Sequence, residues 1–438
     1  MKQIFTLFML LVQSLVFAQA TYTIQGHFPN FPNSQYELKG YNGLEQITIA
    51  TAKSKEAGTF TLTYPATYVG NAQLYMNGAY QNLFLLNKEN IHIFWEDLTK
   101  REGMQITGSA EYDAFLKGMK TFQESQAKLA GLNYLLPLYK KDSIKQLVFA
   151  KELDTVTNAF PAYIKALSDS LYVRQFLLAK GLIEQMPKTV ETYKWRAPAH
   201  VAEFMAIDFK ALKHAGLYKD LIEGYTNLAE RFPLEEVNLL LTEAINKVVT
   251  ELKDQSSTLQ EISLQWFTLL ESKSLFDAAA HLAQTMLKQN TVLDAKSIGL
   301  YKKYEALAIG NTAPNIQLTK KKTLRNINNT ILLVFGSSEC GHCMDAKKEL
   351  EAYYPKWQAK GKIAVVYISL DTDKEVYNKA FGNTPWQTYC DYKGWETQAA
   401  KDYYINAIPT YFLLYKDLKI LVHLRSLGQV DAWVHYKL

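Results

Sequence analysis

One stretch of the sequence constrains the fold more than any other: five consecutive apolar residues, Ile331 to Phe335, with Cys340 and Cys343 soon after them. Five apolar residues are too few for a buried helix, but they match a strand that is buried on both faces. Residues 336–338, Gly-Ser-Ser, break the pattern, and good helix formers follow the second cysteine. The sequence therefore predicts a strand, a turn and a helix, with Cys340 at the helix N-terminus.

That position suits redox chemistry. The unpaired N–H groups and partial positive charge of a helix start favour a thiolate, which is the form that attacks a disulfide. The two-residue spacing lets Cys343 close back on Cys340, so the pair can cycle between dithiol and disulfide. A structural zinc site would need four ligands, and Cys390 and the scattered histidines show no paired spacing. A c-type haem attachment fails because Met344 follows the second cysteine, so we expect no metal and no cofactor.

Residues 1–20 have the pattern of a secretory signal peptide: a basic start at Lys2, an apolar middle from Ile4 to Phe17, and small residues at the end. The apolar run is shorter than the ~20 residues of a membrane span, so we expect a soluble mature chain that begins at Thr21, or at Gln19 if cleavage follows Ala18. We expect it in the periplasm or secreted to the cell envelope, because a thiol pair at one focused motif, in a chain with only three cysteines, fits redox work better than a disulfide framework. The net charge is only +5, and the Lys and Arg residues are interspersed with acidic residues, which indicates no nucleic-acid partner.

Three changes of hydrophobic period predict a multidomain chain. Residues 21–107 alternate with period two and predict an all-β sandwich, in which residues 47–50 and 60–64 form a hairpin. Residues 108–307 show helical spacing after the N-cap candidate Ser109, with roughly six to nine helices separated at breaks. Those breaks are predicted at Gly216, at residues 255–258 and at five prolines: Pro137, Pro161, Pro187, Pro198 and Pro233. Residues 308–438 alternate strand, helix and strand, which predicts an α/β domain with parallel strands.

The C-terminal part resembles the thioredoxin-like fold, and within it the exported thiol–disulfide oxidoreductases of the TlpA/ResA type. The resemblance covers about residues 310–438 and is carried by three motifs. These are Gly310-x-x-Ala313-Pro314, the strand with Cys-x-x-Cys, and Ile408-Pro409-Thr410. It implies that Cys340 attacks, that Cys343 resolves, and that Pro409 is a cis proline exposing the backbone of Ile408 to a peptide. The implied partners are protein thiols or disulfides and an unidentified redox partner.

Two departures from the family pattern bear on redox tuning. Glu339 stands where the family usually has tryptophan, and His342 stands where it usually has proline; Cys-Gly-His-Cys matches the disulfide isomerases of the same superfamily. A charged His342 would stabilise the thiolate, whereas Glu339 would oppose it, so the redox direction stays open. The buried acid that thioredoxins carry six residues before the first cysteine is here Val334, with Glu339 or Glu349 as candidate substitutes.

A second class of function fits the same sequence. On this hypothesis the β and helical domains hold a partner, and the thioredoxin-like module is vestigial or only senses oxidation. The intact cysteine pair beside the expected cis proline argues against a vestigial module, so we favour the enzyme, a thiol–disulfide oxidoreductase. The sequence does not determine the substrate, the electron partner, the oligomeric state or the role of the first two domains; Cys390 is expected to be a buried free thiol.

Overall fold

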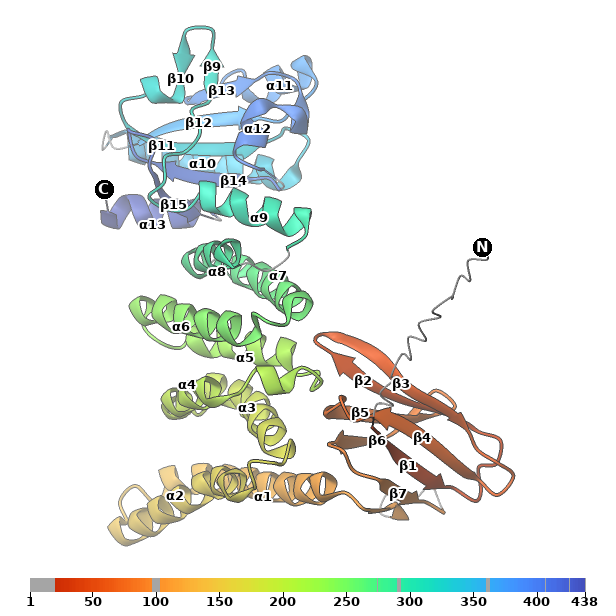
Figure 1. Cartoon of the computed structure of the whole chain (residues 1–438). Helices are drawn as coiled ribbons and strands as arrows, with labels where there is room; N and C mark the ends of the chain where they lie inside the picture. The colour runs from red at the N-terminus through yellow and green to blue at the C-terminus, as the bar shows by residue number, and fades with distance from the viewer. Residues whose placement is uncertain are drawn as a thin grey trace, which may run out of the picture. The chain divides into compact units, whose positions relative to one another are not determined.

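The computed structural model describes residues 20–96, 103–273, 275–289, 293–359, 363–405, 407–424 and 426–437 (Figure 1). The predicted signal peptide lies outside the described residues, apart from Ala20. The chain forms two compact units, residues 1–221 and residues 222–438.

The first unit begins with two four-stranded sheets, ordered β4-β1-β7-β8 and β3-β2-β5-β6. They share one hydrophobic core, to which Ile24 and Leu62 contribute from one sheet and Leu38, Leu74 and Phe84 from the other. This arrangement is the all-β sandwich that the alternating pattern predicts. The strands are β1 Thr21–His27, β2 Gln35–Asn42, β3 Glu45–Lys53, β4 Thr59–Pro65, β5 Gly70–Met76, β6 Ala79–Leu86, β7 Ile91–Phe94 and β8 Gln105–Thr107.

The predicted hairpin between residues 47–50 and 60–64 is wrong. The first segment lies in β3, which pairs with β2, and the second lies in β4, which pairs with β1 in the other sheet. The chain crosses between the sheets after Ser54, whose buried hydroxyl donates to the carbonyl of Phe31 at 2.8 Å. Alternation shows which face of a strand is buried, but two neighbouring strands that bury their faces in one core need not pair with each other.

The helices of the first unit are anchored to the sandwich by Glu111 in α1, which is 0% exposed. Its carboxylate accepts hydrogen bonds from the Asn87 side chain at 2.7 Å, from Tyr172 N–H at 2.8 Å and from Val173 N–H at 2.7 Å. The last two groups lie at the start of α3, where a helix leaves backbone donors unpaired. The helices are α1 Ala110–Leu138, α2 Ser143–Ala166, α3 Val173–Glu191, η2 Lys194–Arg196, α4 Ala197–Ala206 and η3 Lys210–Leu212; α5 Tyr218–Ala229 spans the boundary between the units.

Two of the five prolines predicted to break helices do not. Pro161 and Pro187 lie inside α2 and α3, whereas Pro137 is the last residue but one of α1, Pro198 falls in the first turn of α4 and Pro233 directly precedes α6. A proline inside a helix costs roughly 3 kcal/mol. Long helices with buried faces can absorb that cost through their packing.

The second unit contains α6 Leu234–Leu252, α7 Ser256–Ser272, α8 Phe276–Lys288 and α9 Ala295–Ala306, followed by an α/β domain. Helix α9 is anchored to this domain, because Lys303 Nζ donates to the carbonyl of Tyr404 at 2.5 Å and Leu307 is part of the domain's core. The structure thus shows the predicted succession of β sheets, helices and an α/β domain.

The α/β domain is built on a five-stranded sheet ordered β13-β12-β11-β14-β15. The central strand β11 is buried at every residue and pairs in parallel with β12 and antiparallel with β14. Helices α10, α11 and α13 cover the face that holds Val334, and α12 covers the face that holds Phe335 (Figure 1). The elements are β9 Gln317–Thr319, β10 Lys322–Thr323, η4 Leu324–Asn326, β11 Thr330–Gly336, α10 Gly341–Ala359, β12 Ile363–Ser369, α11 Lys374–Phe381, β13 Gln387–Cys390, η5 Gly394–Glu396, α12 Gln398–Asp402, β14 Thr410–Leu414, β15 Ile420–Leu424 and α13 Leu427–Lys437.

Candidate functional site

The two motif cysteines lie where the central strand passes into α10, as the sequence predicts. Cys340 directly precedes the helix, and the backbone N–H of Cys343 donates to Cys340 Sγ at 3.2 Å. The turn is closed by Cys340 N–H, which donates to the Ser337 carbonyl at 3.3 Å. The sulfur of Cys340 is therefore at a helix start, where backbone donors stabilise a negative charge.

The two thiols differ in accessibility. Cys343 is 0% exposed, whereas Cys340 is partly exposed. Burial raises the pKa of Cys343 to about 12, with smaller contributions from Cys340 and from the carboxylate of Asp371. A substrate can therefore reach Cys340, while Cys343 is held as a neutral thiol behind it.

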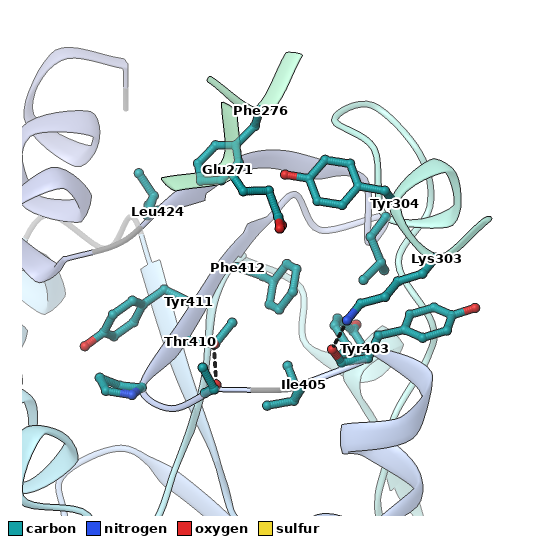
Figure 2. A pocket seen from close by; sticks show the side chains of 14 residues that line it. Glu271, Phe276, Lys303, Tyr304, Tyr403, Ile405, Thr410, Tyr411, Phe412 and Leu424 are labelled. Atoms are coloured by element: carbon teal, nitrogen blue, oxygen red, sulfur yellow. Dashed lines mark hydrogen bonds between the residues drawn. The ribbon is translucent and has the colours of Figure 1, made fainter. Parts of the chain in front are cut away.

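The loop before β14 lies against the accessible sulfur. A cis peptide bond joins Ile408 and Pro409, as the family resemblance implies. The Cys340 thiol donates to the carbonyl of Ile408 at an Sγ to oxygen distance of 3.8 Å. The loop is further tied by Thr410 Oγ1, which donates to the Ala407 carbonyl at 2.7 Å (Figure 2). The structure thus brings together Cys340, Cys343 and Ile408 from segments far apart in the sequence.

The other residues chosen from the sequence lie around this site without entering its interior. Glu339 and His342 are both exposed, on either side of Cys340 along the chain. Glu349, a candidate for proton transfer, is also exposed. Cys390 is half-buried in β13, where its thiol donates to the Asp371 backbone carbonyl at 3.3 Å and burial raises its pKa. Among the described residues, no three His, Cys, Asp or Glu side chains gather as a metal site.

A buried carboxylate, Asp371, was missed by the sequence reasoning. It is 2% exposed and lies just beyond β12, beside the turn that carries the cysteines. Its Oδ1 accepts hydrogen bonds from Ser337 Oγ at 2.7 Å, Ser338 N–H at 2.9 Å and Ser338 Oγ at 2.8 Å, and its Oδ2 accepts one from Ser369 Oγ at 2.5 Å. The available signal was an acidic residue at the C-terminal end of a buried parallel strand adjacent to the cysteine strand, since the C-terminal ends of parallel strands meet at one edge.

A cavity of about 410 Å³ lies beside the loop that holds Pro409. Figure 2 shows aromatic side chains on two sides of it, with Phe412 and Tyr411 from β14 and Tyr304 from α9. Charged groups also line it: Lys303 and Glu271. Burial lowers the pKa of Lys303, and the nearby Glu271 carboxylate acts in the opposite sense.

Comparisons with known proteins give the class of this domain. A thioredoxin-like family model matches residues 328–420, and the model of a domain of unknown function, DUF4369, matches residues 22–115. The C-terminal region is therefore a thioredoxin-like domain of the kind found in thiol–disulfide oxidoreductases, and the N-terminal β region belongs to a domain type without an assigned function. No curated protein matches the chain.

Solved structures similar to this chain include several from Bacteroides species. A thiol–disulfide oxidoreductase from Bacteroides fragilis is 28% identical over 28% of this chain and 98% of its own, with a TM-score of 0.26. The thioredoxin domain of a thiol–disulfide oxidoreductase from Bacteroides vulgatus is 23% identical over 29% of this chain and 99% of its own, with a TM-score of 0.26. A thioredoxin-like protein from Bacteroides caccae is 17% identical over 56% of this chain and 94% of its own, with a TM-score of 0.42.

Proposed function

We propose that the chain is an envelope-side thiol–disulfide oxidoreductase that exchanges disulfides with protein substrates through Cys340 and Cys343. The observation that carries this proposal is the unequal pair of thiols, with Cys340 partly exposed at a helix start and Cys343 fully buried one turn later. The predicted signal peptide supports a location of the protein outside the cytoplasm. In the described part of the chain, no helix has the length and apolarity that a membrane crossing demands.

The exchange runs in two steps when a substrate disulfide is reduced. The Cys340 thiolate attacks one sulfur of the substrate disulfide, forming a mixed disulfide and releasing the other substrate sulfur as a thiolate. Cys343 then loses its proton and attacks Cys340 Sγ, so that the Cys340–Cys343 bond forms and the substrate bond breaks. Two electrons pass from the dithiol to the substrate, and the reverse sequence oxidises a substrate dithiol.

The neighbouring loop and cavity support a polypeptide substrate. The Ile408 carbonyl lies 3.8 Å from Cys340 Sγ, where the backbone of an extended peptide could pair with residue 408. Ala407 and Pro409, which flank that residue, both line the cavity of about 410 Å³. A side chain of the same peptide could occupy this cavity. In that case α9 takes part in substrate recognition together with the thioredoxin-like domain.

Trapping the intermediate tests this function. The Cys343→Ser variant should accumulate mixed disulfides with insulin or with a disulfide-bonded peptide, because Cys340 attacks the substrate disulfide and nothing resolves the product. The Cys340→Ser variant should trap none. The Cys390→Ser variant also removes one thiol from the domain and should retain wild-type insulin turnover.

Two results would contradict the proposal. Equal trapping by Cys340→Ser would reverse the roles of the two cysteines. Wild-type protein whose Cys340–Cys343 disulfide forms reversibly but turns over no insulin or glutathione would favour the alternative, a binding protein with a redox-sensing module. Sequencing the N-terminus of the exported protein tests the location, with Thr21 as the expected first residue.

A further inference from the structure

The strand beneath the cysteines holds no acid that could take the proton of Cys343. Val334, six residues before Cys340, is 1% exposed and packs in the apolar cluster on the α10 face of the sheet. The two glutamates that the sequence offered instead, Glu339 and Glu349, are exposed. Yet Cys343 is 0% exposed and its pKa is raised to about 12, so it needs an acceptor inside the protein before it can resolve a mixed disulfide.

The neighbouring strand presents a hydroxyl at this place. Tyr367 of β12 is the parallel register partner of Val334 and belongs to the same cluster. It is 2% exposed, and among the described residues its hydroxyl has no hydrogen-bond partner. A Cβ added at Gly336 would come within 1.9 Å of Tyr367 Oη and 3.4 Å of Cys343 Cβ. Both groups therefore lie next to the Cα of Gly336, which carries no side chain. A buried hydroxyl without a hydrogen-bond partner costs free energy of folding, so its presence calls for a role at the site.

The carboxylate comes from just beyond the same strand. Leu370 N–H donates to the Gly336 carbonyl at 2.8 Å, which brings Asp371 alongside Ser337. The Ser337 hydroxyl donates to Asp371 Oδ1 at 2.7 Å, while the Ser337 backbone N–H stabilises the Cys343 thiolate. The side chain of Ser337 therefore contacts the buried acid, and its backbone interacts with the buried thiol.

We propose that Asp371 is the acceptor of the Cys343 proton, with Ser337 as the link and Tyr367 as the donor that stabilises the resulting thiolate. This inference rests on the proposed exchange reaction. The Ser337 hydroxyl proton passes to Asp371 while Ser337 takes the proton of Cys343; the Cys343 thiolate then attacks Cys340 Sγ, and the substrate sulfur leaves as a thiolate that solvent protonates. In the oxidising direction, protonated Asp371 returns the proton to Cys343.

A single-turnover experiment separates this step from the first attack. Reduced full-length protein is mixed with glutathione disulfide, and acid-quenched samples are analysed by mass spectrometry for glutathione on Cys340. Formation of this adduct depends on glutathione disulfide concentration, whereas its resolution by Cys343 does not. The Asp371→Asn variant should form the adduct at the wild-type rate and resolve it about 10- to 100-fold more slowly at pH 7.

The pH profile is the readout that a merely structural role would not move. Resolution in Asp371→Asn should rise about tenfold per pH unit from pH 6 to 9 as hydroxide replaces the lost acceptor, while the wild-type profile is flatter. The titratable groups that interact with Asp371 are Cys343 from α10, Tyr367 from β12, Tyr377 from α11 and Cys390 from β13. Burial raises the pKa of each of them above its ordinary value, so they stay neutral over most of this range.

The variants are matched in shape and charge. Asparagine can keep its oxygen towards Ser337 and Ser338 and its amide towards Ser369, so the network survives without a proton acceptor. Asp345→Asn removes an exposed carboxylate of α10 and should behave as wild type in both steps. Ser337→Ala cuts the link and leaves Asp371 in place; it should also slow resolution, and Tyr367→Phe should slow it a few-fold.

The outcomes distinguish the two proposals. Wild-type protein that forms no glutathione adduct on Cys340 would sink the proposed function itself. An adduct that Asp371→Asn resolves at the wild-type rate, with the wild-type pH profile, would overturn the role of Asp371 and leave the exchange reaction standing. If Asp371→Asn does not fold, wild-type resolution in folded Ser337→Ala and Tyr367→Phe would overturn the inference instead.

Discussion

Each compact unit of the chain buries a carboxylate, and the two differ in what surrounds them. Glu111 in the first unit is 0% exposed and accepts hydrogen bonds from the Asn87 amide and from the backbone at Tyr172 and Val173. Asp371 in the second unit is 2% exposed, and three of its four donors are serine hydroxyls. Both are satisfied, as buried charges must be.

The kind of donor separates a structural carboxylate from a chemical one. The backbone N–H groups at the start of α3 can donate a hydrogen bond but cannot accept one. Glu111 therefore serves to hold this helix against the sandwich. Serine hydroxyls can both donate and accept, and those of Asp371 lie beside a buried thiol whose pKa is raised. Burial alone does not identify a functional acid. What identifies it is the presence of neighbouring groups that can exchange a proton with the acid.

The largest expected effect is on stability at Glu111. The Glu111→Ala variant leaves three donors without an acceptor and should lower the free energy of unfolding by about 3–5 kcal/mol. Urea unfolding followed by circular dichroism measures this, with the exposed Glu124→Ala of the same helix as the control. A loss below about 1 kcal/mol would place Glu111 among ordinary surface carboxylates.

A smaller effect concerns the pH dependence of that stability. Burial raises the pKa of Glu111, outweighing its hydrogen bonds, so the folded state holds this proton more tightly than the unfolded state. The contribution is fully present below the unfolded pKa of about 4.3 and is lost as the pH rises through the folded value. Glu111→Gln, which costs about 1–3 kcal/mol through one mismatched donor, should remove this decline with pH. Parallel curves for wild type and variant from pH 4 to 7 would contradict the assignment.

Redox tuning at the second unit should be of similar or smaller size. A protonated His342 favours the Cys340 thiolate and hence the reduced state, so His342→Pro should lower the reduction potential by about 30 mV, or ~1.4 kcal/mol. Proline is compatible with this position in the first turn of α10. Glu339→Gln should shift the potential in the opposite direction. Equilibration with glutathione at pH 6 and 8 measures both, and an unchanged potential in His342→Pro would mean that the imidazole faces away from the sulfur.

The smallest effect tests whether the cavity takes part in recognition. Phe276→Ala should reduce kcat/KM by up to about fivefold for a disulfide peptide with leucine two residues from its cysteine, since about 1 kcal/mol of apolar contact is lost. The matching serine peptide and glutathione disulfide should be unaffected. Leu239→Ala removes an exposed leucine of α6 and serves as the control. Equal losses for the leucine and serine peptides would remove the cavity from the substrate site.

The sequence predicted most of the elements around the cysteines because their patterns are strong and local. Residues 331–335 lie in β11, Cys340 precedes α10, and the strands ending at Ser369 and Leu414 fall where the apolar runs place them. The edge strand β13 was missed, since only four residues form it and none of them is fully buried. The hairpin in the sandwich failed for a different reason, because strand pairing depends on partners distant in the sequence.

By itself, the sequence determined the candidate site residues: a Cys-x-x-Cys pair after a fully buried strand, with Pro409 in a loop some seventy residues away. Only the tertiary structure brings a buried acid near Cys343, the acid that we propose takes its proton. Asp371 lies beside Ser337 because β12 runs parallel to β11 and ends at the same edge, and Tyr367 lies under the site because it is in register with Val334. The separation of two residues along the chain does not predict their distance in space, whereas strand pairing fixes that distance to within a few ångströms.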